Sequence, residues 1–327
     1  MSFTRLFAGI LILAALIAVI LNFGELRHFT ELLRQAKPVW LLAALALQLS
    51  TYVSAAAAWA IVLKAAGTPR SLRSLVPLSI SKLFADQAVP TAGMSGNVFL
   101  VNQLTRRGLP KGNALSALLI SIIGYYLAYA LLALAVLVLL WLHAEATLIL
   151  AISVSVFLLV AFAIGGLTLW LGRRGDRPLP PMLARIRGAR RIHVYFSEAP
   201  TNLLQDRRLI AAAAGFNALI FLADAATLQV CLLALGERVT FNTALIALVM
   251  ASIAVTLGPI PLGLGSFEAV SIAMLRLLHV PLEPAVAGTL LLRGFTLWLP
   301  LIPGLLLSRA SLAKDSGHRQ HPMPDER

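Results

Sequence analysis

The stretch Gly258-Pro259-Ile260-Pro261-Leu262-Gly263-Leu264-Gly265-Ser266-Phe267-Glu268 lies inside an apolar region that runs from residue 241 to residue 278. It cannot continue a helix, because proline lacks an N–H group and glycine costs roughly 1 kcal/mol relative to alanine. Broken backbone at membrane depth is tolerated only where it is buried in protein or lines a cavity. The carboxylate of Glu268 directly follows the break, so this stretch is a candidate binding site.

The composition is that of a protein with many membrane spans. Of the 327 residues, 59% are hydrophobic and only 13% are charged, and the mean hydropathy is +0.86. The net charge of +13 does not indicate nucleic-acid binding, because the basic residues lie between the apolar runs, where they set topology. Cys231 is the single cysteine, and no Cys/His set has metal-ligand spacing. We expect no disulfide within the chain, no metal and no cofactor.

Six apolar runs are predicted to cross the membrane as helices. They cover residues 6–21, 39–63, 114–142, 148–171, 209–235 and 285–307. The first run is followed by Asn22-Phe23-Gly24-Glu25, which offers no small-residue cleavage site, so we expect an uncleaved span. The predicted fold class is therefore an all-α polytopic membrane protein. A single membrane domain covers residues 1–308, and a polar cytoplasmic tail covers residues 309–327.

Two further regions are predicted to be re-entrant hairpins with broken tips. Residues 76–89 are too short to cross a hydrocarbon core that needs about 20 helical residues. They end at Pro90-Thr91-Ala92-Gly93-Met94-Ser95-Gly96-Asn97, and residues 98–104 lead back to a basic turn. The stretch quoted first is the tip of the second hairpin. The tips supply four candidate contacts to a bound headgroup: Ser95, Asn97, Gly263 and Gly265.

The distribution of basic residues predicts the orientation. If both hairpins return to the side they entered, one side receives Arg5, the clusters at 64–73 and 106–111, the Arg-rich loop 172–208 and the tail. The other side receives only Arg27, Arg34, Lys37 and Arg238. The positive-inside rule then places both termini in the cytoplasm. The count does not distinguish re-entrant hairpins from pairs of complete crossings, and residues 241–257 are long enough nearly to cross.

A weak internal repeat links the two breaks. Pro90 and Pro261 are 171 residues apart, and so are Pro110 and Pro281. The repeat units are predicted at residues 39–142 and 209–307, separated by a linking helix and the Arg-rich loop at 143–208. The odd number of crossings between them inverts the second unit relative to the first. Inverted units with broken helices are typical of alternating-access carriers.

Two pairs of charges are placed at membrane depth. Lys82 and Asp86 are four residues apart, which suits a local ion pair that neutralises both, although Asp86 also lies beside the break. Glu268 and Arg293 are expected to pair with each other. That pair either holds the second hairpin to the last span or binds a lipid phosphate through the guanidinium fork.

Other polar groups in the spans favour packing roles. Asp224 lies in mid-span, where a helix–helix contact is favoured over a proton relay. Tyr125, Tyr126 and Tyr129 form a stripe on one side of a helix, which indicates packing, with the lining of a lipid groove as the alternative.

The sequence argues against an enzyme. Gly93-Met94-Ser95-Gly96 has the form found around the nucleophile of rhomboid intramembrane proteases. Such a serine needs a histidine base within hydrogen-bond reach, and the six histidines all fall in predicted loops or the tail. We interpret Ser95 as a polar helix breaker.

The second hairpin and last span resemble a known family. The motifs are Pro259 to Glu268, then Val280-Pro281, then Leu290-Leu291-Leu292-Arg293-Gly294, then Leu299-Pro300 and Pro303-Gly304. Together with the first break and its basic turn, they resemble the lysylphosphatidylglycerol synthase transmembrane-region family. The resemblance covers nearly the whole chain, and it implies a flippase-like bacterial protein in which Glu268 and Arg293 are the residues to test first. Many members carry Arg and an acidic residue in the first motif, where this chain has Thr91 and Asn97.

The resemblance implies movement of a modified lipid between leaflets of the bacterial inner membrane. The chain ends about twenty residues after the last predicted span, so we expect no cytoplasmic transferase domain. The expected ligands are anionic or modified phospholipids, hopanoids or glycolipids, and the headgroup candidates are Glu268, Arg293, Asp86 and Lys82 with the four tip residues. Two alternatives remain: a membrane partner that scaffolds a lipid-modifying enzyme through the Arg-rich loop, and a small-solute carrier. Within that loop, the basic amphipathic segment 183–198 either lies on the anionic cytoplasmic leaflet or is a solvated topology determinant.

Overall fold

The computed structural model describes residues 36–88, 94–142, 147–174, 200–258, 263–301 and 303. Within these ranges every regular element is a helix. The predicted first span, residues 175–199 of the Arg-rich loop and the polar tail lie outside the described residues. Pro90 and Pro261, at the centres of the two breaks, lie outside them as well.

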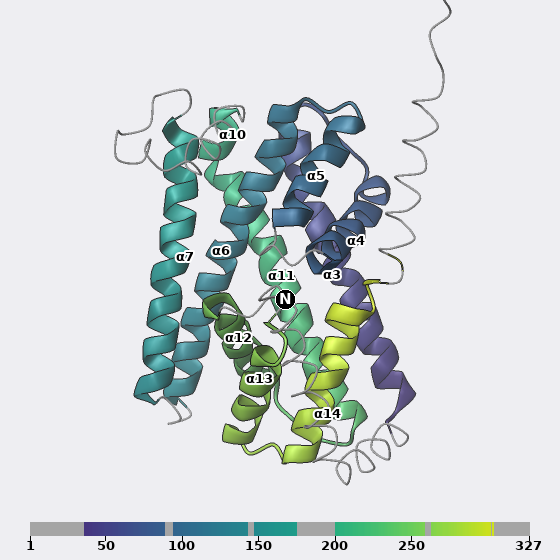
Figure 1. Cartoon of the computed structure of the whole chain (residues 1–327), viewed down its shortest axis with the longest axis vertical. Helices are drawn as coiled ribbons and strands as arrows, with labels where there is room; N and C mark the ends of the chain where they lie inside the picture. Colours follow the sequence, from purple (N-terminus) through teal and green to yellow (C-terminus); the bar gives the residue numbers. More distant parts are fainter. Residues whose placement is uncertain are drawn as a thin grey trace, which may run out of the picture.

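Four helices are long and apolar enough to cross a membrane. They are α3 (Pro38–Ala65), α6 (Lys111–Leu142), α7 (Leu148–Arg174) and α11 (Arg207–Ala234), and they run along the long axis of the molecule (Figure 1). These four match predicted spans. The last predicted span, residues 285–307, begins within α14 (Leu282–Arg293), and its end lies outside the described residues.

The predicted hairpin arms are short helices, in two pairs. The first pair is α4 (Leu72–Ala88) and α5 (Met94–Arg106), and the second is α12 (Phe241–Leu257) and α13 (Ser266–Leu277). Figure 1 shows α4 and α5 beside one half of the long helices and α12 and α13 beside the other half. The order of a long helix, two short helices and a further helix therefore occurs twice, as α3–α6 and as α11–α14.

Local chemistry sets several helix ends. Asp206 precedes α11, and its side chain accepts hydrogen bonds from the backbone N–H groups of Arg208 and Leu209. The Thr240 hydroxyl caps α12 in the same way by accepting from the N–H of Thr243. Pro38 lies in the first turn of α3, where a backbone N–H would have no acceptor within the helix, so the lack of this group costs nothing.

The first break is narrower than predicted. Helix α5 begins at Met94, so Ser95, Gly96 and Asn97 lie in its first turn rather than in the break. Helix α4 begins at Leu72, four residues before the predicted start of this arm, and continues through Pro77. The apolar pattern marks only the part of each arm that lies in the hydrocarbon, whereas the helices extend into polar sequence.

The last predicted span is not a uniform α-helix. After Arg293 the chain forms a short π-helix, η2 (Gly294–Trp298), in which the N–H of Leu299 donates to the Gly294 carbonyl at 2.8 Å. Pro300 follows and cannot donate the N–H that an α-helix would send to Thr296. The wider turn is thus the local response to proline, and it leaves the Thr296 carbonyl open to another donor.

Two apolar cores hold the helices together. One joins α6, α7, α11, α12, α13 and α14, and the other joins α3, α4, α5, α6, α10 (Thr201–Gln205) and α11. Helices α6 and α11 take part in both. They approach closely at Gly124, where a Cβ atom would lie 2.8 Å from the backbone of Ala213 and Ala214.

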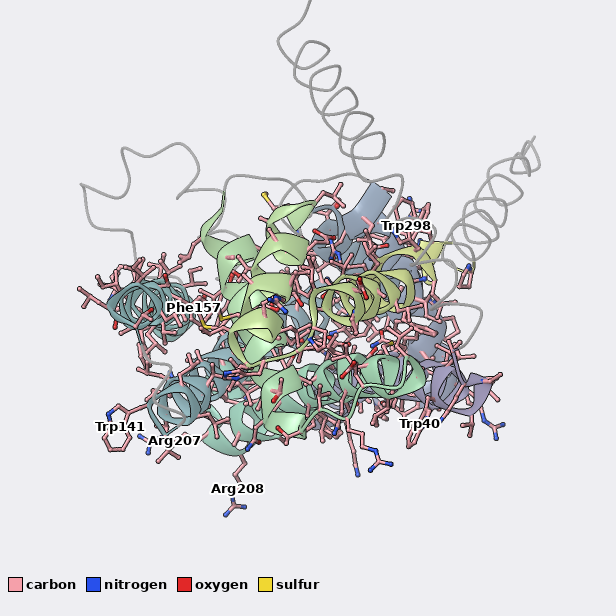
Figure 2. All side chains as sticks on the ribbon, turned by 90° about the horizontal axis from the view of Figure 1, so that it is seen from below. Trp40, Trp141, Phe157, Arg207, Arg208 and Trp298 are labelled. Atoms are coloured by element: carbon pink, nitrogen blue, oxygen red, sulfur yellow. The ribbon has the colours of Figure 1, made fainter. Side chains whose placement is uncertain are left out.

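The outer surface of the bundle is apolar. Trp141 is 72% exposed and Leu148 and Ile149 are each 76% exposed. Figure 2 shows Trp141 and Arg208 projecting away from the helices, whereas Phe157 is buried between α7 and its neighbours. Large exposed apolar side chains around long apolar helices suit contact with lipid.

Candidate functional site

The helix that follows the second break, α13, is capped by the carboxylate of Glu268 in its own first turn. Its Oε2 accepts a hydrogen bond of 2.7 Å from the backbone N–H of Gly265, just before the helix. Its Oε1 accepts one of 2.6 Å from Arg293 Nε, at the end of α14. A carboxylate suits this place because the first N–H groups of a helix lack partners and carry partial positive charge.

The predicted Glu268–Arg293 pair is confirmed. The two side chains are 19% and 11% exposed, so both charges lie largely away from solvent. The Arg293 guanidinium carbon also lies 4.8 Å from the centre of the Phe267 ring, a favourable cation–π arrangement. Because buried charges are costly unless paired, the ion pair holds α13 and α14 in one register.

The first break is closed by Asp86, near the end of α4. Its Oδ2 accepts from Lys82 Nζ at 2.8 Å, which confirms the predicted pair four residues apart. Its Oδ1 accepts from the backbone N–H of Gly96 at 2.8 Å, in the first turn of α5. The hydroxyl of Ser95 donates to the Ala85 carbonyl at 2.8 Å. Asp86 and Ser95 therefore tie the two arms together across the break.

The two breaks use the same chemistry. At each one, a carboxylate directs one oxygen to an N–H at the start of the returning helix and the other oxygen to a basic side chain. The cations differ in origin. Lys82 stands on the same helix as Asp86, whereas Arg293 comes from a different helix than Glu268. Among the described residues, an ion pair to a neighbouring helix is therefore found beside the second break and not beside the first.

A hydrogen bond brings the first break to the end of α14. Gln87, next to Asp86, donates from Nε2 to the Thr296 carbonyl at 3.3 Å, and Thr296 lies in η2, three residues after Arg293. This is the carbonyl that Pro300 leaves without a helical donor. The Oε1 atom of Gln87 is buried and has no hydrogen-bond partner among the described residues. An unpartnered acceptor of this kind can receive a donor from a ligand.

The other predicted tip residues have different surroundings. Gly263 and Gly265 adopt φ angles of 63° and 85°, the left-handed conformation that favours glycine. Asn97 is partly buried in the first turn of α5, and the described residues provide no hydrogen bond to its side chain. Ser95 and Gly265 thus take part in the hydrogen bonds beside the breaks, whereas the Asn97 side chain does not bond to the described residues.

A comparison with known families matches residues 6–304 to the family described as the lysylphosphatidylglycerol synthase TM region. The match spans most of the chain and includes both breaks, the Glu268–Arg293 pair and η2. The chain belongs to this family. A search of curated proteins finds no match. The ion pairs at the two breaks are charged groups that the described part of this chain places among apolar helices.

The sequence did not identify two residues that contact each other beside the first break. Gln87 and Thr296 carry no charge, and their contact spans 209 positions. A signal was present for Thr296, because Pro300 stands four residues after it and must leave its carbonyl without an α-helical donor. No comparable pattern singles out Gln87.

Asp224 makes the predicted helix–helix contact. Its Oδ1 accepts from Gln48 Nε2 of α3 at 2.7 Å, and the same amide nitrogen reaches the Thr227 hydroxyl at 3.2 Å. Gln48 is 2% exposed and was not singled out from the sequence. This polar contact fixes the rotation of α3 against α11.

The tyrosine stripe packs, as predicted. Tyr129 is fully buried against Phe157 and Phe221, with ring centres 4.1 Å and 4.8 Å away. Tyr125 also contacts Phe221 but keeps 38% of its surface exposed. The packing role is confirmed for Tyr129, and the exposed part of Tyr125 remains open to other contacts.

Gly96→Ala is expected to destabilise the first hairpin. A Cβ atom at this position would overlap the Asp86 carboxylate and push it away from the Gly96 N–H. The loss of this charged cap should lower the free energy of unfolding by about 1–2 kcal/mol. Unfolding in detergent micelles, followed by circular dichroism, measures the change.

The matched control is Gly215→Ala in α11. A Cβ atom there would meet nothing within 4 Å, so alanine should stabilise the helix by about 1 kcal/mol. Equal stabilisation by both substitutions would show that Asp86 does not need its contact with Gly96.

Proposed function

We propose that the protein is a flippase-like translocator that carries a lipid headgroup across the bacterial inner membrane. The polar groups at the two breaks would shield the headgroup in mid-membrane while its acyl chains stay in lipid. The observation that carries the proposal is the pair of helix breaks, one beside each half of the bundle, each with a carboxylate that caps the returning helix. Gln87, beside the first break, bonds to Thr296, three residues after Arg293. Membership of the lysylphosphatidylglycerol synthase TM-region family supports the same proposed function.

The architecture supports a transport role. We infer that α4–α5 and α12–α13 are re-entrant hairpins that enter from opposite faces, since α4, α5 and α13 are shorter than a full span and the two pairs lie beside opposite halves of the long helices (Figure 1). We also infer that residues 39–142 and 209–307 are inverted repeat units. Such units place the binding site at their interface in alternating-access carriers.

Arg293 is the proposed contact for an anionic headgroup. A guanidinium binds phosphate and carboxylate through the same fork of N–H donors, so a lipid phosphate can replace Glu268 as its partner. Phe267 would keep the guanidinium in place during the exchange. Lys82 offers a second cation at the first break, and the unpartnered Gln87 oxygen offers an acceptor for a headgroup donor.

The proposed orientation follows the basic residues. Arg70 and Arg107 lie at the end of the first hairpin and bond there, with Arg70 donating to the Arg107 carbonyl at 2.9 Å and Arg107 to the Ser74 carbonyl at 2.8 Å. The positive-inside rule puts this end, and both chain termini, on the cytoplasmic side. We propose no catalytic role for any residue.

The test is lipid movement in proteoliposomes of phosphatidylethanolamine and phosphatidylglycerol that contain a trace of fluorescent phosphatidylglycerol. A membrane-impermeant quencher reports the fraction in the outer leaflet. Wild type should exchange the label between leaflets, whereas Glu268→Gln and Arg293→Met should slow exchange by at least about tenfold, the effect of losing roughly 1.4 kcal/mol at the site. Parallel vesicles with labelled glycolipid or hopanoid identify the headgroup class.

Arg276→Met is the matched control for Arg293→Met. Arg276 lies in the last turn of α13 and donates to the Val280 carbonyl at 3.3 Å, away from the break. Exchange as slow in this control as in Arg293→Met would count against a specific site.

Normal lipid exchange in the Glu268 and Arg293 variants would favour the scaffold alternative. Deletion of residues 183–196 tests that alternative, because a scaffold that lacks them should no longer bind the lipid-modifying enzyme. Uptake of a small solute in place of lipid would favour a carrier.

A further inference from the structure

Asp224 differs from the two carboxylates at the breaks in its partners. Asp86 and Glu268 each hold a cation and a backbone N–H. Asp224 instead receives a hydrogen bond from the neutral amide of Gln48, and no basic side chain of the described ranges forms an ion pair with it. Among the described residues, no cation is thus paired with this carboxylate, although it lies in the middle of α11 among apolar helices.

The groups that face Asp224 are uncharged. Helix α11 packs against α3, α6, α12 and α14. Helix α12 has no charged residue, the lysines of α3 and α6 lie in the terminal turns of those helices, Glu283 lies in the first turn of α14, and Arg293 is held by Glu268. The titratable groups that interact electrostatically with Asp224 are the hydroxyls of Tyr52 on α3 and Tyr125 on α6.

We propose that Asp224 is a proton-binding site through which a transmembrane proton gradient drives transport. This inference rests on the proposed lipid-transport function. An ionised carboxylate without a cation beside it is unfavourable in a medium of low dielectric, so the Asp224 side chain is a candidate to bind a proton. Asp224 is only partly buried, so its carboxylate is not sealed inside the described part of the bundle.

The contacts of Gln48 provide a route from the proton to the first hairpin. The Gln48 amide nitrogen lies between Asp224 and Thr227, and protonation weakens its bond to the acid by removing the charge. One helical turn further along α3, the Tyr52 carbonyl accepts a hydrogen bond of 3.0 Å from the Ser79 hydroxyl of α4. Helix α4 carries Lys82, so movement of α3 against α11 reaches the proposed headgroup site.

The proton balance is simple. A proton from the aqueous phase on one side binds a carboxylate oxygen of Asp224, and the same proton leaves to the other side after the helices have moved. No bond other than that O–H bond forms or breaks. One proton moved per lipid allows a pH difference of one unit to shift the lipid distribution by up to about tenfold.

The experiment imposes a pH difference across proteoliposomes that contain fluorescent phosphatidylglycerol. Wild type should accumulate the label in one leaflet, in a direction that reverses with the gradient. Asp224→Asn, which keeps an oxygen to accept from Gln48, should lose this response and show exchange that does not vary with pH. Asp206→Asn is the control, because this carboxylate caps the exposed start of the same helix, and its variant should respond as wild type does.

Infrared difference spectra between acid and neutral pH give a readout that does not depend on transport. The carbonyl band of a protonated carboxylic acid should appear in wild type and be lost in Asp224→Asn. If wild type moves lipid with no response to the gradient, proton coupling is wrong while the proposed function stands. If wild type moves no lipid, the proposed function fails. An infrared band that Asp224→Asn leaves unchanged overturns the proton site in either case.

Discussion

Arg293→Met is expected to lower the free energy of unfolding by about 3–5 kcal/mol, because it leaves the largely buried Glu268 carboxylate without its cation. Methionine fills a similar space and keeps contact with the Phe267 ring, so the loss reports the charge rather than a cavity. The Glu268 carboxylate would retain only its bond from the Gly265 N–H. Equilibrium unfolding in mixed micelles, followed by circular dichroism, measures the change.

A double variant separates the ion pair from other effects of the substitution. Glu268→Gln removes the opposite charge and still offers an oxygen to the Gly265 N–H. Combining it with Arg293→Met should recover much of the stability, since neither side chain is then charged, and the coupling should exceed about 1 kcal/mol. Losses that simply add would show that the two side chains do not depend on each other.

Gly263→Ala is expected to lower the free energy of unfolding by about 2–4 kcal/mol through two separate costs. The φ angle of 63° is unfavourable for a residue with a side chain. A Cβ atom would also overlap the side chain of Val255 on α12, so the break and its first arm would have to separate. The same unfolding measurement applies, and slower lipid exchange should accompany the loss.

Gly265→Ala isolates the backbone cost. Its φ angle of 85° is also left-handed, but a Cβ atom there would meet nothing within 4 Å. It should cost only about 1–2 kcal/mol, because its N–H can still donate to Glu268. If the two glycine variants lose equal stability, the contact between Gly263 and Val255 contributes nothing.

Patterns within a few residues of each other were sufficient to predict the local structure. Apolar runs predicted the four long helices, and the Pro/Gly clusters predicted that two regions would break, since proline and glycine act on their own turn of helix. The spacing of Lys82 and Asp86 was enough to predict their ion pair. The Glu268–Arg293 pair followed from a different constraint, because two charges at membrane depth must each find a partner.

Two features of the fold depend on which of several competing local interactions is stronger, and the sequence pattern did not predict them. The predicted last span became an α-helix followed by a π-helix, because Pro300 removes a donor while the chain continues. The predicted break of Pro90 to Asn97 shrank, because Asp86 accepts from the Gly96 N–H in the first turn of α5 and Ser95 of that turn donates to the Ala85 carbonyl of α4, so the helix starts earlier. A pattern of residue types does not show which of these local forces is stronger.

The sequence alone determined that this chain forms long apolar helices interrupted twice by proline and glycine, with charges that had to be paired. Tertiary structure alone decided that Gln48 meets Asp224 and that Gln87 meets Thr296, contacts that span 176 and 209 positions. The reason is physical. Helix formation and breaking depend on groups one turn apart, whereas these contacts depend on how whole helices rotate and slide against each other as their apolar faces pack.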